Sequence, residues 1–222
     1  MKKKFRSIDK IVEDQVKRWQ ILHKEKKVAK LIPVITISRE PGSGGRVVAE
    51  GLAEEYGLDL FHQEIIHEMA KSAKVSSNLL KILDEKGLTI LEDFISSLVL
   101  DKYLWPDQYL KHLLKVVGTI GKQGSSIIVG RGANFILPSE ECFRVRITAP
   151  LESRIQLLVH DFNVSEEDAK RRIIKTESER RAFVRKYFYA DIADPKNYDL
   201  VINMEKVTIN TAVNIIGSAM GL

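Results

Sequence analysis

Short apolar runs alternate with longer segments of helical spacing along most of the chain. Each run holds β-favouring residues at consecutive positions, and the five runs span residues 34–37, 58–61, 126–129, 142–148 and 199–203. In the segments between them, apolar residues recur roughly every three to four positions, which is the spacing of helices with one buried face. Strands that alternate with helices in this way favour a parallel sheet with helices packed on it, so the pattern indicates the α/β class.

The first 30 residues do not fit this alternation. They are rich in Lys and Arg, and their apolar residues share one helical face: Ile8, Ile11, Val12, Val16, Trp19 and Leu22. We therefore predict an N-terminal amphipathic helix over residues 1–30, separate from a main domain over residues 31–222. The helix would bury its apolar face on its own domain or on a second copy of the chain, which would make the protein a homodimer. A membrane-surface or nucleic-acid-binding arm is the other interpretation.

A glycine cluster follows the first apolar run. Residues 34–46 read VITISREPGSGGR, and residues 47–56 then take up helical spacing. A strand, a tight glycine loop and a helix in this order present backbone N–H groups and the positive end of the helix dipole to one point, which suits a phosphate. We predict that the loop binds phosphate through six residues: Gly42, Ser43, Gly44, Gly45, Arg46 and Val47. A glycine-rich turn without a ligand is the alternative that the loop alone leaves open.

The loop keeps only part of the consensus P-loop, GxxxxGK[ST]. With Gly44 as the last consensus glycine, Arg39 stands at the first glycine and Gly45 at the lysine, while Arg46 or Val47 takes the place of the hydroxyl residue. Arg46 is then the loop cation closest to the expected β- and γ-phosphates, and Arg39 at the loop entrance is near enough to bend back toward them. We therefore predict a catalytic role for Arg46.

Arginines are prominent at two further places. Gly130-Arg131-Gly132 follows the third apolar run, at the carboxyl end of a predicted strand, where parallel sheets bind ligands. Arg131 is well placed there to hold a phosphate, and a surface arginine in a turn is the alternative. Residues 162–190 contain a predicted helix that begins after Ser165 and carries many basic residues: Arg171, Arg172, Lys175, Arg180, Arg181, Arg185 and Lys186. Such a helix is either a solvated face or a basic lid that closes over substrate.

The bulk composition narrows the class of protein. Of the 222 residues, 44% are hydrophobic and 29% are charged, which suits a soluble domain with a real core. No apolar run approaches the roughly 18 residues that cross a membrane, so we expect a cytoplasmic protein without a membrane partner. The net charge of +5 is slight and is only weak evidence for a nucleic-acid partner.

Cysteine and histidine form no site in the sequence. Cys142 is the single cysteine and lies in the apolar run CFRVRIT, so we expect a buried, inert thiol and no internal disulfide. His62 and His67 flank a helix start, but no cysteine or carboxylate cluster completes a metal site around them. We therefore expect no metal site built from protein ligands.

Five segments together resemble the cytidylate kinase-like family of bacterial P-loop proteins, within the nucleoside monophosphate kinases. They read SREPGSGGRVVAEGLAEEYG, IIVGRGANFIL, ITAPLESR, ERRAFVRKYF and NYDLVIN, and the resemblance covers about residues 34–220. It implies a three-layer α/β/α sandwich with a five-stranded parallel sheet ordered 2-3-1-4-5. It also implies a helical region over about residues 62–124 that receives the acceptor nucleotide, and an arginine-rich lid over about residues 162–190.

The resemblance further implies an enzyme that uses ATP and Mg²⁺ to phosphorylate a nucleoside monophosphate, with CMP the first acceptor to try. By motif, residues 42–46 would hold the donor phosphates, Arg131 the acceptor phosphate, and Arg181 and Arg185 the transferring group. The acceptor is already an anion, so catalysis rests on alignment and charge stabilisation and needs no general base. Mg²⁺ would sit mainly on the nucleotide and on water.

Several departures from true cytidylate kinases open a second hypothesis. The P-loop lysine and hydroxyl are missing, Phe61-His62-Gln63-Glu64 stands in place of an Asp-Thr-Gly stretch, and Gly132 stands in place of an aspartate. These departures bear on cytosine selectivity and on catalysis itself. A catalytically silent nucleotide-binding protein with a regulatory or assembly role is the alternative function.

Overall fold

The computed structural model describes residues 32–71, 79–80, 83, 85–101 and 107–222. The helix predicted over residues 1–30 lies outside these residues. Five strands form one parallel sheet in the order β2-β3-β1-β4-β5, which confirms the predicted fold class and strand order. The strands are β1 (Val34–Arg39), β2 (Asp59–Phe61), β3 (Ser126–Val129), β4 (Cys142–Thr148) and β5 (Leu200–Asn203).

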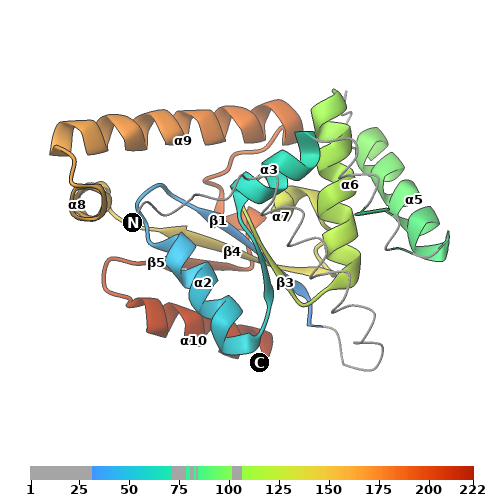
Figure 1. Cartoon of the computed structure of the whole chain (residues 1–222), viewed down its shortest axis with the longest axis horizontal. Coiled ribbons are helices and arrows are strands. Elements are labelled where there is room, and N and C mark those ends of the chain that lie inside the picture. The colour runs from blue at the N-terminus through green and yellow to red at the C-terminus, as the bar shows by residue number, and fades with distance from the viewer. Residues whose placement is uncertain (1–31, 72–78, 81–82, 84, 102–106) are drawn as a thin grey trace, which may run out of the picture.

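Helices cover both faces of this sheet and give three layers (Figure 1). One face carries α2 (Gly45–Tyr56) and α10 (Ile209–Met220), and the other carries α3 (Gln63–Lys71), α6 (Gln108–Gln123) and the short α7 (Ala133–Ile136). Helix α5 (Glu85–Asp101) packs on α6 at the side of the molecule.

The two faces of the sheet enclose two hydrophobic cores. Side chains of β1 alternate between them, because successive residues of a strand point to opposite faces. Val34 packs with the α3, α6 and α7 layer, whereas Ile35 and Ile37 pack with the α2 and α10 layer. The apolar run of β1 is therefore continuous in sequence because both of its faces are buried.

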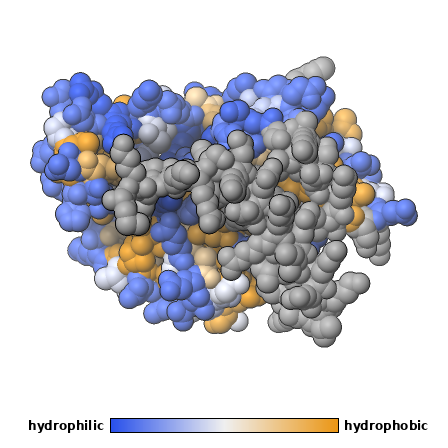
Figure 2. Space-filling model, viewed as in Figure 1, coloured by the Kyte–Doolittle hydropathy of each residue, from blue (hydrophilic) through white to orange (hydrophobic). Residues whose placement is uncertain are grey.

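Two further helices, α8 (Leu151–Phe162) and α9 (Glu166–Phe188), follow β4. Ser165 caps α9 by accepting a 3.1 Å hydrogen bond from the Asp168 amide, at the predicted position. The first half of α9 packs on α8, and its last turns enter the main core through Val184 and Phe188. Helix α9 runs along the upper edge of the view, where hydrophilic residues predominate on the surface (Figure 2).

Cys142 is 5% exposed, so the predicted burial of this thiol is confirmed. Burial raises the pKa of the Cys142 thiol to about 12, which keeps it protonated and unreactive near neutral pH. Over the described part of the chain, no helix has both the length and the apolar character that crossing a membrane requires.

Candidate functional site

The glycine loop joins the central strand β1 to helix α2. Gly42 and Gly44 have φ angles of 78° and 76°, a left-handed conformation that glycine adopts at little cost. Gly44 is the N-cap of α2 and makes no side-chain hydrogen bond to the first turn. The first amides of a helix have no partner within it, so those of Gly45, Arg46 and Val47 are left for an anion.

Ser43 shapes the loop from within. Its side chain is 4% exposed, and its Oγ lies 2.9 Å from the carbonyl oxygen of Glu40 and 3.3 Å from that of Ile147. Its amide donates to the same Glu40 carbonyl at 3.2 Å. Ser43 therefore closes the turn and ties it to β4, which holds the following amides in place.

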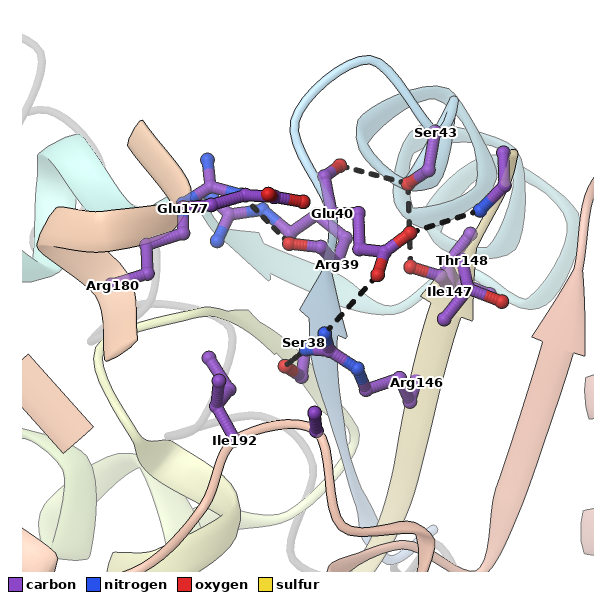
Figure 3. Close-up of polar contacts among 12 residues, drawn as sticks. Ser38, Arg39, Glu40, Ser43, Arg146, Ile147, Thr148, Glu177, Arg180 and Ile192 are labelled. Carbon is purple, nitrogen blue, oxygen red and sulfur yellow. Dashed lines mark hydrogen bonds and ion pairs between the residues drawn. The ribbon is translucent and has the colours of Figure 1, made fainter. Parts of the chain in front are cut away.

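Glu40 anchors the loop to neighbouring elements through its side chain (Figure 3). The carboxylate accepts a 3.1 Å hydrogen bond from the Ala149 amide and lies 3.7 Å from both Arg146 Nη2 and Arg154 Nε. Arg154 also pairs with Glu177 of α9 at 2.6 Å. The two arginines balance the negative charge that Glu40 brings into a loop suited to phosphate.

Arg146 is a buried cation within the apolar run of β4. Its Nη1 donates a 2.8 Å hydrogen bond to Ser38 Oγ, and its guanidinium stacks over the Tyr198 ring at 5.7 Å. The sequence alone indicates no role for this arginine, because residues 142–148 have the pattern of a buried strand. Arg146 lies between Val145 and Ile147 in the strand, so its side chain is expected to face the side of the sheet opposite to theirs.

Arg46 and Val47 lie on the exposed surface of the first turn of α2. The Arg46 side chain is 68% exposed, and its Nε donates to Glu50 Oε1 at 3.0 Å. An exposed pair at this helical spacing contributes only about 0.3–0.5 kcal/mol. The pair with Glu50 therefore restrains the Arg46 side chain only weakly.

A pocket of about 190 Å³ lies at the ends of β1 and β3, beside the glycine loop. Its lining includes three arginines, together with one glutamate and one phenylalanine: Arg39, Arg131, Arg180, Glu179 and Phe183. The carboxyl edge of a parallel sheet is the usual ligand-binding edge of such folds. The excess of positive charge makes this pocket suited to an anion.

Arg131 occupies the tip of the β3 turn in a strained conformation. Its φ is 53°, between Gly130 and Gly132, and a non-glycine residue in this region costs roughly 1–3 kcal/mol. Its guanidinium lies 5.7 Å from the centre of the Phe183 ring. Arg131 Nε and Asn134 Nδ2 are buried and have no hydrogen-bond partner among the described residues. Two unpartnered donors from residues that line one pocket favour a ligand with acceptor oxygens.

Arg39 and Arg180 meet on the loop side of this pocket. Arg39 Nη2 donates to Gln63 Oε1 at 2.7 Å, and Arg180 Nη1 donates to the Arg39 carbonyl at 2.7 Å. Burial and the Arg180 charge lower the pKa of Arg39 to about 9, against the opposing effect of Glu64. Burial and the Arg146 charge lower the pKa of Arg180 to about 10. Both side chains remain cationic at neutral pH, and an anion would relieve their mutual repulsion.

Gly132 lies against the end of α9. A Cβ at this position would come 2.3 Å from Cε2 of Phe188, and the φ of Gly132 is 69°. A side chain at this position, such as the aspartate that the family resemblance implies, would collide with that ring. The departure at Gly132 therefore follows from the way α9 packs on the β3 turn.

Two of the predicted site residues lie away from the pocket. Arg181 and Arg185 are exposed on another side of α9, where they line a separate surface hollow. The helical periodicity of the sequence could have separated them from Arg180. Ile173 and Val184 mark the buried face of α9. Arg180 lies seven residues after Ile173 and four before Val184, which places it on that same face. The roles of Arg181 and Arg185 stay predictions.

The strand order, the glycine loop and the arginine-lined pocket define an α/β kinase fold of the P-loop class. Residues 34–206 match the model of the cytidylate kinase-like family, so the chain belongs to this family. It is 30% identical over 186 residues to a cytidylate kinase of Desulfurococcus amylolyticus, covering 83% of this chain and 90% of that protein. It is 27% identical over 184 residues to a cytidylate kinase of Staphylothermus marinus, covering 82% and 93%.

One solved structure supports the fold. An uncharacterized protein from Eubacterium ventriosum superposes with a TM-score of 0.65 at 22% identity, over 85% of this chain and 98% of that chain. The family resemblance inferred from the five sequence segments is thus confirmed.

Proposed function

We propose that this protein transfers the γ-phosphoryl group of ATP to a nucleoside monophosphate, with CMP the first acceptor to test. The observation that carries the proposal is the convergence of Arg39, Arg131 and Arg180 in one pocket beside a glycine loop at a helix N-terminus. Membership of the cytidylate kinase-like family supports a nucleotide kinase.

In this mechanism the loop amides and Arg46 hold the donor phosphates, and Arg131 holds the acceptor phosphate. An oxygen of the acceptor phosphate forms a bond to the γ-phosphorus while the bond from that phosphorus to the bridging oxygen of ADP breaks. No proton has to be removed, because the attacking oxygen is already anionic. The chain contributes alignment and positive charge around the transferring group.

The residues around the loop do not fit a protein-held Mg²⁺. Arg46 replaces the consensus hydroxyl residue, and the Glu40 carboxylate is engaged by Arg146, Arg154 and the Ala149 amide. Among the described residues, no group of three or more His, Cys, Asp or Glu side chains could hold a metal ion. Mg²⁺ is therefore expected to arrive on the nucleotide.

Two regions are proposed to close the site. The helical region of about residues 62–124 supplies Gln63 to the pocket, and the lid of about residues 162–190 supplies Arg180. These contacts support acceptor binding between the two regions, with Arg181 and Arg185 drawn toward the transferring group only if α9 moves.

A silent nucleotide-binding protein is the second candidate function, and two observations favour it. Gly45 provides no cation at the lysine position, and Arg46 is paired with Glu50 away from the pocket. Both features are compatible with nucleotide binding that does not lead to transfer.

A coupled ADP-release assay across nucleoside monophosphates, with MgATP as donor, tests the proposal. We expect turnover with CMP at least, and Arg131→Ala should raise the acceptor KM on the order of 100-fold because a phosphate contact is lost. Lys170→Ala, on the exposed surface of α9, is the matched control. ATP binding without turnover on any monophosphate would establish the silent binder instead. In an ATP-bound structure, a phosphate should lie against the amides of residues 44–46, because the Ser43 amide already donates to the Glu40 carbonyl.

A further inference from the structure

The side chain of Arg39 and the absence of a side chain at Gly45 are two halves of one steric arrangement. A Cβ built on Gly45 would lie 2.7 Å from the Cβ of Arg39 and 3.1 Å from the Cβ of Ile147. Two Cβ atoms do not approach to 2.7 Å, and the Arg39 Cβ is not the mobile end of a side chain, whereas the 3.1 Å contact needs Ile147 to give by only a few tenths of an ångström. In this loop only one of positions 39 and 45 can carry a side chain.

The consensus P-loop satisfies the same restriction in the opposite way. It has glycine at the position of Arg39 and lysine at the position of Gly45. This chain has exchanged the two, so its cation enters from the strand side of the loop instead of the helix side. The absence of a lysine at Gly45 is therefore linked to the presence of Arg39 at the position of the first consensus glycine.

The exchange directs the cation into the pocket at the ends of β1 and β3. Arg39 Nη1 lies 2.7 Å from the site of a Cβ on Gly130, so the absence of a side chain at Gly130 gives it room. Its Nη2 contacts Gln63, which carries no charge. The Arg39 charge thus faces Arg131 and Arg180 without a direct carboxylate partner among the described residues.

We propose that Arg39 is the relocated phosphate-binding cation of this loop, and that it contacts the transferring phosphoryl group from the acceptor side. This inference rests on the proposed function. It deepens that function by naming the residue that replaces the P-loop lysine. As the new P–O bond forms and the bond to the ADP bridging oxygen breaks, the Arg39 guanidinium and the loop amides lie on opposite sides of the phosphoryl oxygens.

Three variants test the exchange: Arg39→Gly, Arg39→Gly with Gly45→Lys, and Arg39→Ala with Gly45→Lys. Arg39→Gly should lower kcat/KM on the order of 100-fold, comparable with the loss of one preorganised charge. Adding Gly45→Lys to it restores the consensus pattern and should recover at least about tenfold of that loss. The double variant with Arg39→Ala differs from the one with Arg39→Gly by one methyl group at position 39. This methyl group still collides with the Cβ of the lysine at position 45, so no kcat/KM should be recovered.

The outcomes separate the proposal from a structural role of Arg39. If Arg39 only holds Gln63 and α9, Gly45→Lys will not restore the rate of Arg39→Gly, and the proposal is overturned. It is also overturned if Arg39→Gly matches the parent, or if both double variants recover equally. Thermal unfolding of each variant shows whether a loss of rate is a loss of fold.

A parent without turnover on any monophosphate would contradict the proposed function and not this inference. In that case the affinity for MgATP, measured by calorimetry, tests the role of Arg39. The inference requires weaker binding in Arg39→Gly by about tenfold or more and recovery in the version with Gly45→Lys. Unchanged binding in Arg39→Gly would overturn it.

Discussion

Arg180 of helix α9 donates a 2.7 Å hydrogen bond to the backbone carbonyl of Arg39 at the end of strand β1 (Figure 3). This contact links the arginine-rich helix directly to the first residue of the glycine loop. It also places the Arg180 guanidinium among the groups that line the pocket. The contact favours Arg180 as the arginine of α9 nearest the proposed phosphoryl transfer, whereas the family resemblance implies Arg181 and Arg185.

Replacing Arg180 by alanine should therefore reduce kcat/KM on the order of 100-fold, because one cation of the pocket is lost. We expect Arg181→Ala to cost less than about tenfold, since its side chain is exposed on another side of α9. Steady-state kinetics with varied acceptor compares the two neighbours, and Lys170→Ala controls for changes on the surface of the same helix. A larger loss in Arg181→Ala than in Arg180→Ala would favour the role that the family resemblance implies for Arg181.

Replacing Arg46 by alanine separates catalysis from stability. The exposed pair with Glu50 contributes little, so the free energy of unfolding should change by only a few tenths of a kcal/mol. Turnover should fall on the order of 100-fold, or about 2.7 kcal/mol, if Arg46 moves onto the donor phosphates. Glu50→Gln is the matched control, because it breaks the pair with Glu50 and keeps the positive charge of Arg46. Equal turnover in Arg46→Ala and the parent would remove Arg46 from the mechanism.

Gly132→Ala tests the packing of α9 on the β3 turn. The added Cβ meets the Phe188 ring at 2.3 Å at a φ of 69°, so strain and overpacking together should lower the free energy of unfolding by about 2–5 kcal/mol. Gly57→Ala is the control, because Gly57 has a φ of 62° and no atom within 4 Å of the added Cβ. That change should cost about 1–2 kcal/mol. Urea unfolding measures both, and equal losses would show that Phe188 moves aside freely.

The pH dependence of kcat/KM reports the ionisation of the free enzyme. Burial lowers the pKa of Arg39 to about 9, together with the charges of Arg180, Arg131 and Arg146, and Glu64 opposes this shift. The cationic form binds the anion, so kcat/KM should fall as the pH rises through about 9. In Arg39→Gly the profile should lose this alkaline decline while its level drops. An unchanged decline in that variant would assign it to another group.

The sequence by itself determined the local elements and the family. The third and fourth apolar runs coincide with β3 and β4, and Ser165 caps α9 as the pattern predicts. These features depend on periodicity and on short-range hydrogen bonds, which neighbouring residues carry. The sheet order came from the resemblance and not from the periodicity, because strand order depends on contacts between residues far apart in the chain.

Only the tertiary structure decided which arginines share a pocket. Arg39, Arg131 and Arg180 come from β1, the β3 turn and α9, and only the packing of these elements brings them to one pocket. The dependence of Gly45 on Arg39 and of Gly132 on Phe188 was equally invisible in the sequence, since each is a contact across the fold. A motif records which residues are present, whereas the packing of β1, β3 and α9 sets where their charges meet.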